Sequence, residues 1–176
     1  LIRREKKMEA IVYTSNTGTT KEYAKLLSDK LSLPYYSLDE IKNKVKPGGK
    51  IIYLGWIMAS GVKGYKKAIK DYDVCAVGAV GMGATGTQVK EVRTKNKIPS
   101  SKPVFTLQGG FDVKKLHGIY KLMMTIMVKT AGKGLANKQD RTQEEDQMLE
   151  MMLHGGKYVD EKNLKAILDW YGKRGE

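Results

Sequence analysis

The stretch Thr14-Ser15-Asn16-Thr17-Gly18-Thr19-Thr20 lies between a short apolar run, Ala10-Ile11-Val12-Tyr13, and a segment with helical periodicity, residues 21–31. A strand that ends in small hydroxylated residues around one glycine, followed by a helix start, brings backbone N–H groups and hydroxyls together. We expect an anion to bind there. A Ser/Thr-rich helix start also occurs as a plain N-cap, and this alternative stays open.

The loop differs from a nucleoside triphosphate site, which requires the spacing G-x-x-x-x-G-K-[ST]. It holds one glycine, and Lys21 follows two threonines. Neutral donors without a charge inside the loop suit a compact monophosphate held without a metal. The pattern resembles the flavodoxin family, whose first strand ends in a [ST]-x-T-G-x-T loop that binds the phosphate of flavin mononucleotide (FMN). The resemblance implies FMN as cofactor, with phosphate contacts from Ser15, Asn16, Thr17, Gly18, Thr19 and Thr20.

Apolar runs alternate with helix-period segments along the chain, which predicts an α/β fold with a parallel sheet and helices on both faces. The expected strands are residues 10–13, 34–38, 50–54, 73–80 and 103–107. The expected helices are residues 19–31, 62–70, 87–93, 119–128, a segment from 142 to 153, and 161–171. The resemblance implies a flavodoxin-like doubly wound five-stranded sheet in the order 2-1-3-4-5.

In a doubly wound sheet the loops after strands one, three and four converge at the carboxyl edge, where the strand order reverses. Here these loops are residues 14–20, 55–61 and 81–86, and all three contain glycine. They match, in order, the phosphate loop and the two isoalloxazine-flanking loops of the flavodoxin family. The ring contacts implied by this match are Met58, Ala59, Ser60, Met82, Gly83, Ala84 and Thr85.

Two features of these loops have alternative interpretations. Trp56 stacks on the flavin or points into the core, and its place directly after Gly55 favours the core; it remains a candidate cofactor contact. Residues 81–86 spell G-x-G-x-x-G, which is also a dinucleotide-binding pattern. That reading is disfavoured because the motif follows the fourth strand, and the next strand has no acidic residue at its tip for a ribose.

Composition sets the remaining limits. The 176 residues suit one domain, residues 8–176, after a disordered basic extension, residues 1–7. The single cysteine, Cys75, lies in an apolar strand and predicts packing. We nominate no catalytic side chain and no metal site, and neither His117 nor His154 is given a role. A reducing, cytoplasmic setting is expected, because the cysteine cannot form an internal disulfide and no signal-peptide pattern is present.

The net charge of +13, from 32 Lys and Arg against 19 Asp and Glu, draws the protein toward anionic partners. A generally lysine-rich solvated surface explains it equally well. Nucleic acid is not expected, because aromatic residues are not interleaved with the basic ones.

The segment from residue 108 to residue 160 is too long for a plain connection before the last helix. Within it, residues 119–128 form a methionine-rich helical pattern flanked by lysines, and Gly132 and Gly134 are expected to end this helix. Thr142 and Glu145 form a capping box for a second helix. The first helix either packs on the core or lies on an anionic membrane, in which case the protein lies at the inner face.

This tail is similar to the flavodoxin-domain branch that includes the menaquinone-dependent protoporphyrinogen oxidases. The likeness rests on the methionine-rich helix, Ala131-Gly132-Lys133-Gly134 and a final helix. It implies an FMN-dependent oxidoreductase that passes reducing equivalents between an organic substrate and a quinone or similar small-molecule acceptor. Residues 111–120 have few aromatics and no arginine, unlike those oxidases, so a tetrapyrrole substrate stays open. A non-enzymatic FMN electron carrier and a cofactor-free interaction domain are the alternatives.

Overall fold

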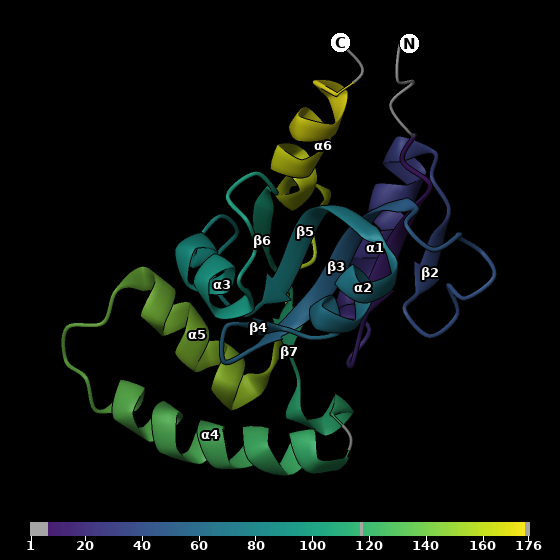
Figure 1. The fold of residues 1–176 in the computed structure, drawn as a ribbon. Coiled ribbons are helices and arrows are strands. Elements are labelled where there is room, and N and C mark those ends of the chain that lie inside the picture. The colour runs from purple at the N-terminus through teal and green to yellow at the C-terminus, as the bar shows by residue number, and fades with distance from the viewer. Residues whose placement is uncertain (1–6, 117, 175–176) are drawn as a thin grey trace, which may run out of the picture.

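The structure of the protein is a computed structural model that describes residues 7–116 and 118–174 (Figure 1). Its strands are β1 Ala10–Thr14, β2 Tyr35–Ser37, β3 Lys50–Met58, β4 Gly61–Val62, β5 Asp73–Gly81, β6 Val104–Gln108, β7 Gly110–Phe111 and β8 Gly156–Lys157. Its α-helices are α1 Thr19–Leu31, α2 Tyr65–Asp71, α3 Val89–Asn96, α4 Gly118–Ala136, α5 Gln143–His154 and α6 Lys165–Gly172.

Five parallel strands form the central sheet in the order β2-β1-β3-β5-β6. With the two-residue β4 set aside, this is the predicted order 2-1-3-4-5, so the α/β fold with a five-stranded parallel sheet is confirmed. The order reverses at β1, because β2 lies on one side of it and β3 on the other. The carboxyl ends of β1 and β3 therefore flank the switch point, where ligands bind in sheets of this kind.

Alternate side chains along the strands form two separate cores. On one face, Ala10 and Val12 of β1 pack with buried residues of α2 and α3. On the other face, Ile11 and Tyr13 pack with buried residues of α1 and with Ile167 of α6. The sheet thus has helices on both faces, as the alternating pattern predicts. Cys75 is buried in the second core, in keeping with a packing role.

The third strand is longer than expected, and this corrects two predictions. The segment 55–61 was predicted as a loop, but β3 continues to Met58 and turns back into β4, so that Ile57 pairs with Val62. Helix α2 therefore begins at Tyr65 and not at residue 62. Gly55 does not break the strand. It allows close packing, because a Cβ there would lie 2.6 Å from the carbonyl oxygen of Lys63.

After β6 the chain leaves the sheet and forms a separate element, residues 110–157, which we call the arm. It contains α4 and α5, and its ends are joined by the antiparallel pair of β7 and β8. In Figure 1 α4 crosses below the sheet, at the end opposite to α6. The arm confirms the predicted helical extension after the last sheet strand and the capping box, in which Thr142 accepts a bond from the Glu145 N–H.

Helix α4 also corrects the prediction that Gly132 and Gly134 end it, because it runs through both to Ala136. Its inner face packs into a small core of its own, in which Met124 and Val128 contact Phe111, Leu116 and Met151. Among the residues that the structure describes, no helix combines the length and the apolar character needed to cross a membrane. Of the predicted extension, residues 1–7, all but Lys7 lie outside the described residues, as does His117.

Candidate functional site

The loop between β1 and α1 holds a buried hydroxyl that has no partner. Thr20 is fully buried in the first turn of α1, and its Oγ1 makes no hydrogen bond within the described part of the chain. The first N–H groups of a helix have no partner inside the helix, so donors gather at this end. Gly18 enters α1 with φ +100°, and its N–H donates to Ser15 Oγ at 3.1 Å. The hydroxyl of nearby Thr14 already has a hydrogen-bond partner, because its Oγ1 lies 2.7 Å from Tyr53 Oη.

A cavity of about 280 Å³ opens beside this loop. The loop contributes four of the predicted phosphate contacts to its lining, Asn16, Thr17, Thr19 and Thr20. Ser15 and Gly18 do not line it. Gly18 lines a second cavity of about 150 Å³, which shares Thr17 and Thr19 with the first and also reaches Lys115 and Lys157 of the arm. The structure therefore divides five of the six predicted loop residues between two adjoining cavities, and Ser15 lines neither.

The hairpin of β3 and β4 also lines the cavity, with Met58, Ala59 and Ser60. Ala59 and Ser60 form its turn with φ +47° and +62°, a two-residue connection with both residues in the left-handed region. Asn96 of α3 holds this turn from outside the cavity. Its Nδ2 donates to Ser60 O at 2.8 Å, and its Oδ1 accepts from Val62 N–H at 2.9 Å. These two hydrogen bonds, one buried and one partly buried, thus fix a turn whose residues lack the conformational freedom of glycine.

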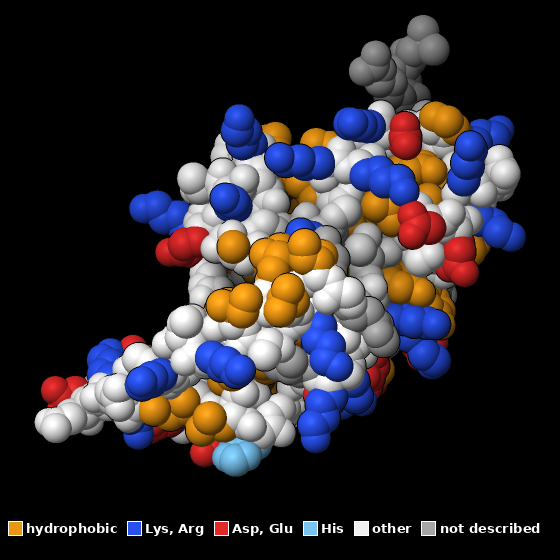
Figure 2. All heavy atoms as spheres, turned by 90° about the horizontal axis from the view of Figure 1, so that it is seen from below, with side chains coloured by type: hydrophobic (Ala, Val, Ile, Leu, Met, Phe, Trp, Pro, Cys, Tyr) orange, Lys and Arg blue, Asp and Glu red, His pale blue; other side chains and the backbone are white. Residues whose placement is uncertain are grey.

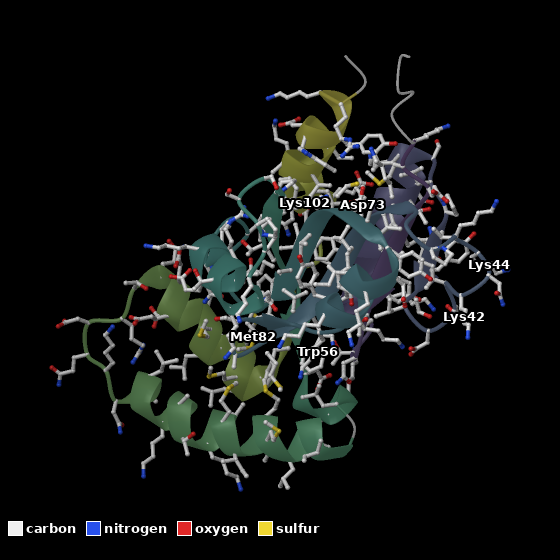
Figure 3. The ribbon with its side chains drawn as sticks, in the orientation of Figure 1. Lys42, Lys44, Trp56, Asp73, Met82 and Lys102 are labelled. Carbon is white, nitrogen blue, oxygen red and sulfur yellow. The ribbon has the colours of Figure 1, made fainter. Side chains whose placement is uncertain are left out.

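Trp56 lines the cavity and is half-buried, which corrects the preference for a core position. The ring lies at the end of the sheet near α4 and α5, as does Met82 (Figure 3). Lys63 Nζ lies 5.7 Å from the centroid of the indole, within the range of a cation–π contact. The lysine thus adds a positive charge beside the ring.

The glycine-rich loop after β5 is split by the structure. Met82 and Gly83 line the cavity, together with Gly81. Ala84 lines a neighbouring space, and its carbonyl accepts from Thr87 Oγ1 at 2.6 Å. Thr85 Oγ1 accepts from the Gln108 N–H at 2.9 Å and so joins this loop to the end of β6. Ala84 and Thr85, which were predicted as ring contacts, therefore do not line this cavity. The cavity residues from Trp56 to Ser60 and from Val80 to Gly83 are called the sheet wall.

Sequence reasoning missed the second wall of the cavity, which comes from the arm. Its members are largely apolar: Phe111, Asp112, Leu116, Met124, Met127 and Met148. With Met58 and Met82 of the sheet wall, five of the nine methionines of the chain line one space. The spacing of Met124 and Met127 puts them on one side of α4, and this was the available signal. It could not say which surface they would face.

Titratable groups are scarce in the cavity. Asp112 is the one ionisable residue among those described as lining it, and its Oδ1 accepts from Lys114 N–H at 2.9 Å. Two tyrosines support the walls from behind. Burial raises the pKa of Tyr53, whose hydroxyl donates to Lys63 O at 2.6 Å. Burial also raises the pKa of Tyr23, which donates to Gln108 O and accepts from Asn163 Nδ2 at 2.7 Å. Both stay protonated at neutral pH.

Comparison of the chain with protein-family models, with curated proteins and with solved structures gives no match. Function has to be inferred from the cavity itself. His154 lies outside it, exposed on α5, with Nε2 3.9 Å from Glu150 Oε2. The cavity combines donors at a helix start with a mostly apolar space, and this combination decides which ligands fit.

Proposed function

We propose that the protein is an FMN-binding oxidoreductase of flavodoxin-like fold. It would pass reducing equivalents between an organic substrate and a quinone or similar acceptor, and a protoporphyrinogen-like compound is one substrate of this kind. The single observation that carries the proposal is the orphaned Oγ1 of buried Thr20 at the start of α1. A buried hydroxyl without a partner costs stability, and a bound phosphate would supply the missing acceptor.

The loop fits a phosphate dianion in charge as well as in shape. The N-terminus of a helix carries a partial positive charge, and its N–H groups point outward to an anion. Asn16, Thr17 and Thr19 surround the same end of the cavity with neutral donors. A triphosphate would need a lysine and a metal-binding hydroxyl in the loop spacing that this chain lacks. A monophosphate on a larger ligand is therefore the better match.

The remainder of the cavity fits a flat, largely apolar ring. Trp56 and Met58 line it on one side, and Met124 and Met127 line it from the arm. Ligand pockets are typically apolar with a few polar groups that fix orientation, and their volumes begin at about 300 Å³. The loop would fix the phosphate end of FMN, and the ring would lie between the two walls. FMN, when bound, supplies the electron-transfer chemistry at its ring.

The chain's own residues would bind and shield rather than transfer protons. The methionines and Trp56 would exclude water from the ring site, and the backbone N–H groups of the cavity-lining Gly83 and its neighbours would be available to hydrogen-bond the polar edge of the ring. Asp112 is the one described cavity residue that could accept or deliver a proton.

Two functions are compatible with bound FMN. An electron carrier needs a ring edge open to a protein partner, whereas an enzyme needs room for a small substrate beside a covered ring. The arm contributes Leu116, Met127 and Met148 to the cavity and so covers it, which favours the enzyme. Reduction by NAD(P)H and reoxidation by a soluble quinone, followed by stopped-flow absorbance, would separate the two. A carrier turns over only when a protein partner is added.

Titration of FMN into the apoprotein, followed by quenching of flavin fluorescence, tests the binding step. Thr20→Val keeps the volume and removes the hydroxyl, so it should weaken FMN binding by about 2 kcal/mol, roughly thirtyfold. In the absence of FMN the same change should raise the free energy of unfolding by about 1 kcal/mol, because an unpaired buried polar group is removed.

Thr94→Val is the matched control, since Thr94 is exposed on α3 and outside this cavity. It should change neither the affinity for FMN nor the free energy of unfolding of the apoprotein. A Thr20→Val variant that is less stable than the parent in the apo form would show that the hydroxyl has a partner within the protein. The absence of quenching with the parent protein would remove the FMN proposal altogether.

A further inference from the structure

Helix α4 is apolar on two sides, and only one of them is covered. Met124 and Val128 pack in the small core of the arm, and Met127 lines the cavity. On the outer side Ile119 is 68% exposed, Leu122 62% and Ile126 54%. The apolar face of a helix is normally packed against another part of a structure. The exposed outer side of α4 therefore indicates a surface that binds another molecule or a membrane.

The exposed residues form one continuous stripe. Ile119, Leu122, Met123 and Ile126 recur at the three- and four-residue spacing of one helix face. Lys129 and Lys133 follow Leu122 and Ile126 by seven residues and so continue the same stripe. We call the stripe, with its two lysines, the α4 face. Figure 2 views the molecule from below, the side on which α4 lies, and shows hydrophobic side chains among lysines and arginines there.

The charged residues of α4 itself all have one sign. Helix α4 carries Lys121, Lys129 and Lys133 and no acidic residue, and Lys114 and Lys115 precede it. In the first turn of α5, Glu145 pairs with Lys138 at 2.6 Å and Asp146 with Arg141 at 2.6 Å, which offsets two of its three acidic residues, Glu144 being the third. An apolar stripe bordered by lysines complements a surface that is apolar inside and anionic outside.

We infer that the α4 face docks on the surface of an anionic lipid bilayer. Ile119, Leu122, Met123 and Ile126 would enter the boundary between headgroups and acyl chains, and Lys129 and Lys133 would extend to the phosphates. The helix would lie in the plane of the surface, in keeping with the finding that no described helix can span a membrane. The docking itself does not depend on FMN.

Docking would also place the cavity beside the bilayer, because Met127 of the same helix lines it. An apolar redox partner dissolved in the lipid could then reach the cavity without crossing water. This consequence rests on the proposed function, whereas the docking can be tested on the apoprotein alone.

Co-sedimentation of the full chain, without FMN, with vesicles of defined composition is the test. The protein should bind vesicles of phosphatidylcholine that contain one third phosphatidylglycerol, and should remain in the supernatant with phosphatidylcholine alone. Leu122→Ser combined with Ile126→Ser should lower the partition coefficient by at least about tenfold. Lys129→Gln combined with Lys133→Gln should lower it by about the same factor.

Helix α2 supplies matched controls. Ile69→Ser changes a side chain that is 47% exposed, and Lys66→Gln with Lys70→Gln removes two exposed lysines. Both variants should bind within about twofold of the parent. Equal losses in the α2 and α4 lysine variants would mean that diffuse positive charge causes binding, and the inference would be wrong.

A second copy of the chain is the alternative partner for the α4 face. Sedimentation equilibrium without lipid should show a monomer for the parent and for the Leu122→Ser, Ile126→Ser variant. A dimer that this variant dissociates would overturn the inference. Thermal unfolding of each variant guards against misfolding, and variants at exposed positions should unfold within a few degrees of the parent.

Discussion

The two walls of the cavity are built by different means. The sheet wall is held by directed hydrogen bonds: Asn96 fixes the turn at Ser60, and Tyr53 joins Thr14 to Lys63 O. The arm wall is held by the packing of flexible side chains around Phe111 and Met151. A hydrogen-bonded backbone keeps one geometry, whereas side chains such as the three methionines of the arm wall, Met124, Met127 and Met148, adapt to what they contact. The difference separates a part that can position a cofactor from a part that can accommodate a variable ligand.

In the proposed function this division has a chemical sense. Electron transfer to and from a flavin needs a fixed ring position, which the sheet wall and the loop before α1 would supply. A substrate or acceptor enters and leaves, so the wall that faces it gains from side chains with several rotamers. The predictions that follow test whether the sheet wall is as rigid, and the arm as tolerant, as this comparison requires.

The largest effect is expected at Gly64, which lies outside the cavity beside the hydrogen bonds of Thr14 and Tyr53 that support the sheet wall. Gly64 has φ +80°, and a Cβ there would overlap Tyr53 Oη and Thr14 Oγ1. Gly64→Ala should lower the free energy of unfolding by about 4 kcal/mol, from left-handed strain, overpacking and a broken hydrogen bond. Denaturation with urea, followed by circular dichroism, measures the loss.

Gly48→Ala separates strain from packing. Gly48 has φ +75°, but a Cβ there would meet nothing within 4 Å. Gly48→Ala should therefore lower the free energy of unfolding by only about 1 kcal/mol. Equal losses at Gly48 and Gly64 would show that the hydrogen bonds between Thr14, Tyr53 and Lys63 add no rigidity, and the comparison of the two walls would lose its basis.

The sheet half of the molecule could be predicted from local patterns. Val12 and its neighbours form an apolar run that ends in a glycine-containing loop, and the same sequence of signals recurs after β5. The predictions that were wrong concern glycines whose role is set by residues distant in the sequence. Gly55 was taken as the end of a strand, but it is required where the backbone of Lys63 passes close to β3. No local pattern carries that information.

The arm could be predicted only in outline. The capping box at Thr142 and the methionine-rich run gave two helices, because both signals are local. Which surface each helix covers depends on the path of the chain after β6. No sequence pattern therefore predicted that Met124 and Met148 would line the cavity. Trp56 was misjudged for the same reason, since its exposure depends on where the arm lies.

A smaller effect is expected when the turn of the sheet wall is released. Asn96→Ala removes the hydrogen bonds to Ser60 O and Val62 N–H and should cost about 2 to 3 kcal/mol of stability. It should also weaken FMN binding by about tenfold, because Met58 to Ser60 lose their fixed position. Quenching of flavin fluorescence on addition of the apoprotein measures the affinity for FMN.

Met127→Leu is the counterpart in the arm wall. Met127 lines the cavity from α4, and a swap that conserves volume should cost less than about 1 kcal/mol and change FMN binding less than threefold, roughly. If Met127→Leu weakened FMN binding as much as Asn96→Ala, both walls would position the cofactor, and the division between them would fail.

The smallest effect, and opposite in sign, is expected at Gly134 in the arm. Sequence patterns place the end of α4 near this residue, whereas the helix continues to Ala136, and a Cβ at Gly134 would meet nothing within 4 Å. Gly134→Ala should therefore raise the free energy of unfolding by about 0.8 kcal/mol, the helix propensity difference between the two residues. A helix that ended at Gly134 in a left-handed cap would instead be destabilised by alanine, by about 1 kcal/mol. The sign of the change, measured by urea denaturation, distinguishes an α4 that continues to Ala136 from one that ends at Gly134.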